Sequence, residues 1–293
     1  MKVLKSSSVR FVPGVTVLVC VFLATGTPAQ KTTPAETQAE SAESHLQKAR
    51  DLFQDKKYGA AGSEAKRAIK IKKELAPAYV LLGMIHLREG KTDEALRDVG
   101  KAIKYDPNSV EAHYLRGILQ FEERKFSDAR DEAVFVISQG GRFPNAYTLL
   151  AQTQMATDRY REALEAFENA LRLTADGDDD AAKLREQIEA VKGCLETREM
   201  RRDPSYVLPR PIGFPQPRYS EQARSLRIQG TVRLGLLVNE EGSVISTIIL
   251  VPLGFGLDEE AVKAVRQLRF IPAMKNGQAV RFWQRLDIEF NLR

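Results

Sequence analysis

The side chains best suited to chemistry are scattered along this sequence rather than clustered. The chain holds three histidines, His45, His86 and His113, and each lies in a stretch with helical apolar periodicity. None belongs to a pair at i and i+4, the spacing that presents two imidazoles to one metal ion on a helix. We therefore expect these histidines to be structural, and the sequence predicts no metal site.

Two other stretches could bind an ion or a phosphate, but neither has the required pattern. The acidic run from Asp176 to Asp180 lacks the alternating ligands and the closing Glu of a calcium loop. It is better interpreted as the start of a helix, where negative charge is favourable. The run Gly254-Phe255-Gly256 is too short for a phosphate loop and precedes Asp258, which repels phosphate. We expect no catalytic residues and no cofactor, so the protein is predicted not to be an enzyme.

Cysteine usage is sparse. Cys20 lies in the N-terminal apolar run, which leaves Cys194 as the single thiol of the remaining chain. One thiol cannot form an internal disulfide. We expect Cys194 to be a half-buried structural residue on a helix, and the alternative is an intermolecular disulfide.

Net charge does not favour nucleic-acid binding. Residues 41–202 contain 28 basic and 28 acidic side chains, and residues 206–293 contain 12 basic against 8 acidic ones. Nucleic-acid binding normally requires a concentrated basic patch, and the sequence shows no dense basic run. We therefore expect protein partners and no nucleic acid.

Apolar and polar side chains alternate in the last segment of the chain, from Val280 to Phe290. One face carries Val280, Phe282, Leu286, Ile288 and Phe290, interrupted only by Gln284, and the other carries Arg281, Trp283, Arg285, Asp287 and Glu289. A period of two predicts a strand with one face on a core and the other in water. A last strand often lies at a sheet edge, where free N–H and C=O groups can pair with another chain.

The N-terminus has the features of an export signal. Lys2, Lys5 and Arg10 precede a 14-residue apolar run, and small residues follow, so we predict a signal peptide over residues 1–29. The apolar run is shorter than the ~20 residues that span a bilayer as a helix. The alternative is an uncleaved signal that remains as a membrane anchor. Residues 30–43 lack apolar periodicity and are predicted to be a flexible tether.

An internal repeat of 34 residues follows. Four registers recur in phase: Ala49, Gly83, Gly117 and Ala151; Ala61, Ala95, Ala129 and Ala163; Ala68, Ala102, Val136 and Ala170; and Tyr58, Thr92, Phe126 and Tyr160. Small residues at this period indicate paired helices that approach closely, as in a helix–turn–helix solenoid.

This pattern resembles the tetratricopeptide repeat. The second copy carries the family residues Tyr79, Leu82, Gly83, Ala95, Ala102 and Pro107, whereas the third has Arg116 where Leu is usual. We expect four repeats over 44–174 and a capping helix over 175–202. The resemblance implies a concave, partner-binding groove lined by Val80, Met84, Leu87, Tyr114, Ile118 and Phe121. The alternative is that these side chains form the core between repeats.

Five prolines fall within residues 203–217, which predicts a stiff, extended linker. Beyond it, apolar periodicity changes to a helix–strand–strand–helix–strand order over residues 218–293. The expected fold class is therefore multidomain, an all-α repeat solenoid followed by a small α+β domain.

The C-terminal module resembles the TonB C-terminal domain. The resemblance rests on Gln216-Pro217-Arg218-Tyr219, Leu226-Arg227-Ile228 with Gly230, Gly242 with Val244, Leu257-Asp258, Arg269-Phe270, Pro272-Ala273 and Asn276-Gly277. One departure is Ser220, which stands where Pro usually follows the Tyr.

That resemblance implies mechanical coupling in the cell envelope. Members of the family work with an ExbB–ExbD-type motor and capture a segment of a TonB-dependent outer-membrane receptor as an added strand, with backbone hydrogen bonds providing the affinity. The residues implied to contact the partner are Gln216, Tyr219, Arg281, Trp283, Arg285 and Asp287. For Trp283 the alternative is local packing.

Two functions remain open at this point. In the first, the repeats dock one partner while the C-terminal module engages an outer-membrane transporter or another envelope protein by strand addition. In the second, the chain is a soluble periplasmic scaffold whose C-terminal module makes a homodimer. Both place the protein in the periplasm, or in the inner membrane facing it if the signal is retained.

Overall fold

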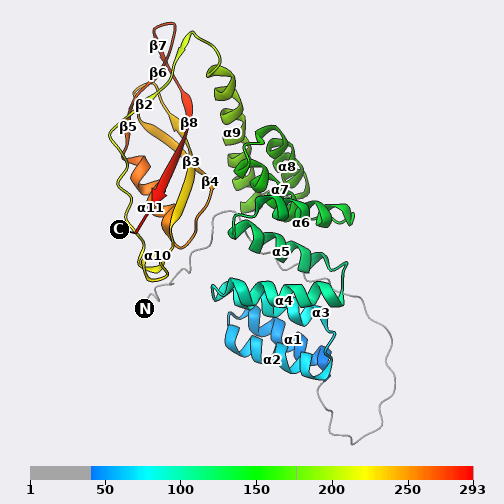
Figure 1. Cartoon of the computed structure of the whole chain (residues 1–293). Helices are drawn as coiled ribbons and strands as arrows, with labels where there is room; N and C mark the ends of the chain where they lie inside the picture. The colour runs from blue at the N-terminus through cyan, green and yellow to red at the C-terminus, as the bar shows by residue number, and fades with distance from the viewer. Residues whose placement is uncertain (1–40, 176, 293) are drawn as a thin grey trace, which may run out of the picture. The chain divides into compact units, whose positions relative to one another are not determined.

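The computed structural model describes residues 41–175 and 177–292, so the predicted signal peptide and nearly all of the tether lie outside the described residues. The chain divides into two compact units, with the boundary between Gly141 and Arg142. Each unit is described by itself below (Figure 1). The expected fold class, a helical repeat solenoid followed by a small strand-rich domain, is confirmed.

The first unit consists of three antiparallel helix pairs. Its helices are α1 (Ala42–Gln54), α2 (Tyr58–Ile71), α3 (Ala76–Arg88), α4 (Thr92–Tyr105), α5 (Val110–Glu122) and α6 (Phe126–Ser138). The first helix begins two residues before position 44, because the Ser41 hydroxyl accepts a hydrogen bond from the Ser44 amide at 3.0 Å and caps it.

The small residues of the 34-residue period lie where the helices cross. Ala49, Ala61 and Ala95 are fully buried. A Cβ on Gly83 would come within 2.9 Å of a methyl carbon of Val99 and 3.1 Å of one of Leu115. Glycine at this position therefore allows the helices to approach at a distance that a larger residue would prevent.

A fifth 34-residue register, which sequence reasoning missed, consists of buried carboxylates that lie beside histidines. The pairs are His45 with Glu64, His86 with Asp98 and His113 with Glu132, at N–O distances of 2.7, 3.0 and 2.7 Å. All three carboxylates are less than 9% exposed as residues. His45 and His113 are thus structural in geometry, because each satisfies a carboxylate that would be costly to bury alone. Nδ1 of His86 lies near Asp98 but makes no hydrogen bond.

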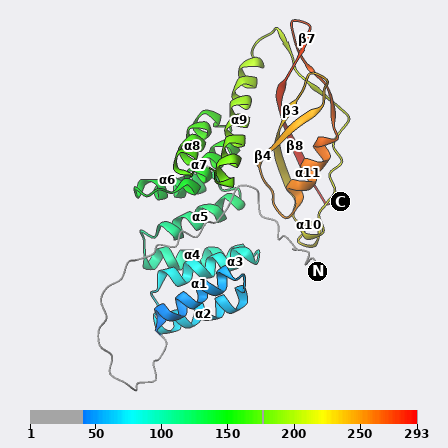
Figure 2. The same ribbon diagram turned by 180° about the vertical axis from the view of Figure 1, so that it is seen from behind.

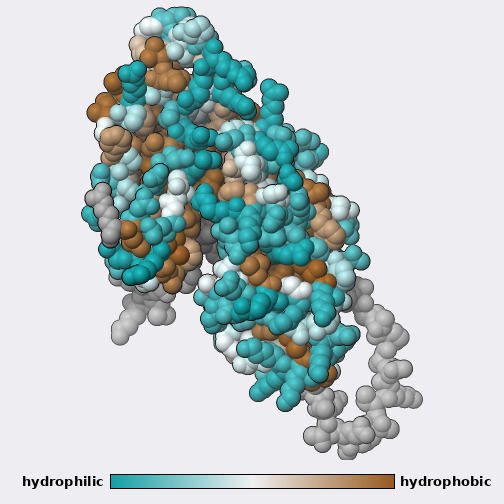
Figure 3. All heavy atoms as spheres, in the orientation of Figure 1, coloured by the Kyte–Doolittle hydropathy of each residue, from teal (hydrophilic) through white to brown (hydrophobic). Residues whose placement is uncertain are grey.

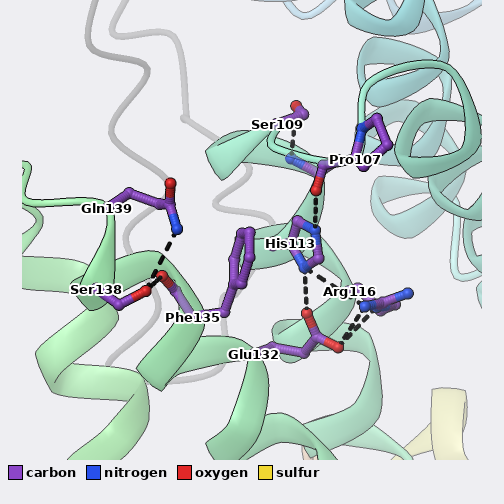
Figure 4. A network of polar contacts seen from close by, with 9 residues as sticks. Pro107, Ser109, His113, Arg116, Glu132, Phe135, Ser138 and Gln139 are labelled. Atoms are coloured by element: carbon purple, nitrogen blue, oxygen red, sulfur yellow. Dashed lines mark hydrogen bonds and ion pairs between the residues drawn. The ribbon is translucent and has the colours of Figure 1, made fainter.

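The His113 pair forms the centre of a larger network (Figure 4). Its Nε2 lies 2.9 Å from the carbonyl oxygen of Pro107, and its ring stacks on Phe135 with the centroids 3.8 Å apart. Arg116 donates from Nε to Glu132 at 2.8 Å. This contact explains why Arg replaces the usual Leu in the third repeat: the arginine satisfies the second oxygen of the buried carboxylate.

The second unit begins with the fourth repeat and continues into the C-terminal fold. It contains α7 (Pro144–Ala156), α8 (Tyr160–Leu173) and α9 (Asp179–Met200). Helix α9 is capped by Asp178, whose carboxylate accepts from the Asp180 amide at 3.1 Å. Asp178 to Asp180 therefore form the start of a helix, as the sequence indicated, and Asp176 lies outside the described residues.

A three-stranded antiparallel sheet in the order β4-β3-β8 forms the centre of the C-terminal fold. Its strands are β3 (Gly230–Val238), β4 (Val244–Val251) and β8 (Phe282–Phe290). Strand β3 pairs with β8 over nine residues, from Gly230 opposite Phe290 to Val238 opposite Phe282.

Helix α11 (Leu257–Arg266) covers one face of this sheet, the face turned to the viewer in Figure 2. The shared core contains Val232, Leu234 and Leu236 of β3, Ile288 and Phe290 of β8, and Leu257, Ala261 and Val265 of α11. Helix α10 (Glu221–Ser225) precedes β3 and is capped by the Ser220 hydroxyl, which accepts from the Ala223 amide at 3.0 Å. The departure from proline at this position therefore supplies a helix cap.

The proline-rich segment, expected to be a stiff, extended linker, contributes short strands to the C-terminal fold. Strand β1 (Tyr206–Val207) pairs with β6 (Ala273–Lys275), which also pairs with β7 (Gln278–Val280), and β2 (Arg210–Ile212) pairs with β5 (Arg269–Ile271). Proline is tolerated in such short edge strands because no central ladder needs its missing N–H. The segment belongs to the C-terminal fold and does not hold that fold away from the last repeat, since α7 contacts β4 and α9 contacts β8.

Across residues 41–292, apart from residue 176, no helix combines the length and apolar character needed to cross a membrane.

Candidate functional site

Strand β8 lies at an open edge of the central sheet. Within the described residues it pairs with β3 and with no other strand. An antiparallel strand with a single neighbour leaves about half of its backbone N–H and C=O groups directed away from the ladder. The Arg285 carbonyl already accepts a hydrogen bond from Nε2 of Gln284, at 2.8 Å.

The face of β8 that points away from α11 carries three of the residues predicted to contact a partner, Trp283, Arg285 and Asp287. All three make contacts inside the unit. Trp283 packs on Gly193 of α9, so closely that a Cβ at residue 193 would lie 1.9 Å from the indole Nε1. Helix α9 therefore covers the first half of this face.

Arg285 and Asp287 belong to a charge network that extends to the turn between α7 and α8. Arg285 donates to Asp158 at 2.8 Å, and Arg233 of β3 donates to both oxygens of Asp287 at 3.0 and 3.1 Å. Asp158 also accepts from the Tyr160 hydroxyl at 2.9 Å, and burial raises the pKa of Tyr160 to about 12. The network ties the fourth repeat to the sheet.

The end of α9 adds a contact on the opposite side of β8. Arg201 donates to Oε1 of Gln284 at 2.8 Å and lies 5.4 Å from the ring centroid of Phe282. Gln284, the one polar residue on the apolar face, thus has a specific partner. Next to Gly193, burial raises the pKa of the Cys194 thiol to about 11, and the half-buried, unpaired thiol matches the structural role expected of it.

The other three predicted contact residues lie outside β8. The Tyr219 hydroxyl donates to the Ile228 carbonyl at 2.7 Å, and its ring meets Phe290 edge-on with the centroids 5.6 Å apart. Arg281 is exposed and pairs with Glu240 at 3.2 Å. Gln216 is exposed. The geometry gives Tyr219 a role in anchoring the start of the domain against the end of β8.

Strand β4 forms the other edge of the sheet and borders a groove of about 440 Å³ between α9 and α11. Its lining includes Thr247, Ile248 and Ile249 of β4, Glu186 and Gln187 of α9, and Glu259, Val262, Lys263 and Arg266 of α11. Residues of both helices therefore line the β4 edge.

The residues predicted to line a groove in the repeats divide into two groups. Val80, Ile118 and Phe121 are buried at 6%, 3% and 6% exposure, and the ring of Phe121 packs against Phe126. Met84, Leu87 and Tyr114 are half-buried. The first group contributes mainly to the core of the repeats, and the second has surface left for a partner.

Sequence reasoning missed Gly193, Asp158 and Arg233. A signal existed for two of them. Gly193 is the single glycine in a 22-residue helix, and Asp158, with a φ of 60°, occupies the left-handed position that Lys56, Gly90 and Arg124 occupy at the same 34-residue period. An acid at that position occurs only in the fourth copy. Arg233 gave no signal, because its partner depends on strand register.

No group of three or more potential metal ligands occurs among residues 41–292, residue 176 aside.

A search of curated protein sequences found no match. Similar solved structures include PilF of Pseudomonas aeruginosa (20% identity, 53% of this chain and 73% of that chain, TM-score 0.46). A second is a thermophilic repeat protein of Thermus thermophilus (16% identity, 53% of this chain and 82% of that chain, TM-score 0.45). A third is MamA of Desulfovibrio magneticus (16% identity, 54% of this chain and 97% of that chain, TM-score 0.43).

Models of known protein families match both the repeats and the C-terminal module. Two tetratricopeptide repeat models match residues 80–134 and 144–176, and the model of the C-terminal domain of the Gram-negative bacterial TonB protein matches residues 215–292. Both are interaction domains without catalytic activity of their own. Residues 80–134 and 144–176 are therefore tetratricopeptide repeats, and residues 215–292 are a C-terminal domain of the TonB family, joined in one chain for protein–protein interaction.

Proposed function

We propose that this chain is an exported cell-envelope adaptor whose C-terminal domain captures a segment of an envelope protein by strand addition to β8, while the repeats dock a second partner. The observation that carries this proposal is the sheet order β4-β3-β8, which leaves β8 without a second neighbouring strand. Strand addition derives its affinity from backbone hydrogen bonds, so the edge rather than a side-chain pocket is the essential feature.

The contacts along β8 suggest where such a strand begins. Arg201, Gly193 and Asp158 contact residues 282–285, in the first half of the strand. The second half, from Leu286 to Phe290, has two outward side chains: Asp287 is bonded within the sheet, to Arg233, and Glu289 is exposed. A partner segment would therefore pair first along Leu286–Phe290 and would extend toward Trp283 only as α9 shifts.

The partner class follows from the family to which the domain belongs. An outer-membrane receptor with a free N-terminal segment is the proposed occupant, and the chain would act as a transport accessory of the energy-transducing system. The half-buried Met84, Leu87 and Tyr114 are the proposed contact surface of the repeats.

Hydrogen exchange on the full chain tests strand addition directly. The probes are synthetic peptides with the N-terminal sequences of outer-membrane receptors from the same cell, each paired with a version carrying proline at alternate positions. We expect slowed exchange at alternate amides of β8 with the unmodified peptide and no change with the proline version, which lacks the required N–H groups.

Three outcomes would contradict the proposal: protection confined to β4, protection confined to the repeats, or equal protection by the two peptides. A peptide-free chain that is dimeric in sedimentation, with its β8 amides already protected, would instead support the scaffold with a self-associating C-terminal domain.

A further inference from the structure

The β2–β5 ladder carries two arginines and two isoleucines on one face. The pairing places Arg210 opposite Ile271 and Ile212 opposite Arg269. Residues directly opposite in a ladder share a face, as do residues two apart in a strand. All four side chains therefore project to the same side, and all four residues are exposed. The other face carries Phe270, which is 3% exposed and part of the core.

Large apolar side chains on this face are open to solvent to an unusual degree. Ile212 is 60% exposed and Ile271 is 55% exposed. Phe214 lies two residues after the end of β2 and is 85% exposed, between Gly213, with a φ of +94°, and Pro215. Figure 3 shows apolar surface at the upper left of the molecule, where Figure 1 labels β2 and β5, interspersed with hydrophilic residues. We call Arg210, Ile212, Phe214, Arg269 and Ile271 the ladder patch. A folded chain gains nothing from such exposure unless another surface covers it.

The two segments that form the ladder patch carry positive charge only. The two strands of the patch come from segments without any acidic residue, 204–220 and 261–286. The cations of these segments are Arg210, Arg218, Lys263, Arg266, Arg269, Lys275, Arg281 and Arg285. Three of these cations pair with acids from other segments: Lys263 with Glu260, Arg281 with Glu240, and Arg285 with Asp158. Arg269 donates a hydrogen bond to the Ser243 hydroxyl at 2.8 Å. Strand pairing thus concentrates positive charge that is diluted along the sequence.

We propose that the ladder patch docks the C-terminal domain on the surface of an anionic phospholipid bilayer. Phe214, Ile212 and Ile271 would enter the boundary between headgroups and acyl chains, while Arg210 and Arg269 contact lipid phosphates. A basic surface with protruding aromatic and aliphatic side chains has the composition that binds this boundary. Phe214, Ile212 and Ile271 are 85%, 60% and 55% exposed, and the ladder places Arg210 and Arg269 beside the two isoleucines. The patch therefore offers both the apolar side chains and the cations that an anionic bilayer binds, and the bilayer is the proposed occupant.

A tryptophan placed at the patch gives a local test in the full chain. In Phe214→Trp the new indole should be quenched by brominated lipids in vesicles of equal parts phosphatidylglycerol and phosphatidylcholine, and not in vesicles of phosphatidylcholine alone. The signal of native Trp283 is subtracted using the unmodified chain. Leu226→Trp is the matched control, because Leu226 is 55% exposed but lies outside the patch, and it should show no quenching. The local readout is independent of any insertion by the N-terminal apolar run, which all variants share.

Charge removal tests the same surface through affinity. The double variant Arg210→Gln with Arg269→Gln should weaken binding to the anionic vesicles roughly 30-fold, about fivefold for each arginine lost. The control Arg161→Gln with Arg172→Gln removes the same charge from exposed positions of α8 and should leave binding unchanged. Thermal unfolding of each variant confirms that the fold is retained.

The proposal is overturned if residue 214 is not quenched, or if both double variants bind alike. It is also overturned if heparin, a soluble polyanion, binds in a manner that depends on Arg210 and Arg269 while vesicles do not, since the patch would then accept a polyanion and not a bilayer.

Discussion

Gly193 and Trp283 are in direct contact, 90 positions apart in the sequence. The indole occupies the space that a side chain at residue 193 would fill: a Cβ there would lie 1.9 Å from Nε1 and 2.0 Å from Cδ1. The contact seats α9 on the outer face of the sheet, so the fourth repeat, its capping helix and the C-terminal domain form one unit. A residue predicted to flank a partner strand is thus already part of an internal interface.

Substitution Gly193→Ala should lower the free energy of unfolding of this unit by about 1–3 kcal/mol, because the methyl group overlaps the indole. The emission of Trp283, the only tryptophan, should shift to the red as the ring is displaced. Urea denaturation followed by this emission measures both effects. Gly100→Ala in α4 of the first unit is the control, followed by helical circular dichroism: apart from its own helix backbone, no atom lies within 4 Å of a Cβ there, so alanine should stabilise by up to ~1 kcal/mol. Stabilisation by both substitutions would contradict the close contact.

The Cys194 thiol should report the same interface through its reactivity. Burial raises its pKa to about 11, so in a Cys20→Ser background alkylation at about pH 8 should be on the order of a hundredfold slower than for a free thiol. The rate should climb with pH toward the raised pKa. Since the folded state holds the proton more tightly, the thiol's contribution to stability is complete below the unfolded pKa near ~8.5 and declines as pH rises toward 11.

Gly193→Ala should accelerate this alkylation, as α9 separates from the sheet. An alkylation rate in the unmodified chain equal to that of a small-molecule thiol would show that Cys194 is not protected by this packing.

Arg116→Leu should destabilise the third repeat, even though leucine is the usual residue at that position in the repeat family. The change removes hydrogen bonds to the buried Glu132, at an expected cost of about 1.5–3 kcal/mol. Arg97→Leu is the control. The Arg97 side chain is 64% exposed and lies 3.4 Å from Glu94, so its loss should change stability by less than about 0.5 kcal/mol. Far-ultraviolet circular dichroism during denaturation follows both variants. An increase in stability for Arg116→Leu would show that the network is dispensable.

The pairing of Glu64 with His45 should make the first repeat sensitive to acid. The hydrogen bond to His45 lowers the pKa of Glu64, and Arg67 and Lys48 act in the same direction. A lowered folded pKa stabilises the fold above the unfolded carboxyl pKa of ~4.3, and this contribution is lost as pH falls through the folded value. The stability difference between the unmodified chain and Glu64→Gln should therefore shrink in this acid range.

Helical circular dichroism during denaturation at several pH values below neutrality measures that difference. Asp55→Asn, at an exposed carboxylate paired with Lys57, is the matched control and should change the free energy of unfolding by less than about 0.5 kcal/mol. A gap between Glu64→Gln and the unmodified chain that stays constant into the acid range would contradict the pairing.

The sequence by itself determined the elements and their type. The 34-residue period reports helix pairs because small residues are needed wherever two helices cross, and each copy encodes its own crossing. The alternation from Val280 to Phe290 likewise identifies β8, since Phe282, Ile288 and Phe290 are all buried on one face. Such patterns can be recognised in a sequence because each depends on residues that are only a few positions apart.

Only the tertiary structure decided that β8 is an edge strand, that α9 packs on Trp283, and that the proline-rich segment pairs with other strands of the fold. Pro211 lies opposite Phe270, and Arg210 lies opposite Ile271, which joins segments about 60 residues apart. A high density of proline shows that a segment cannot form a helix. It does not show which strand the segment will pair with. Contacts such as Arg285 with Asp158 depend on register and docking between distant segments, and no local periodicity encodes them.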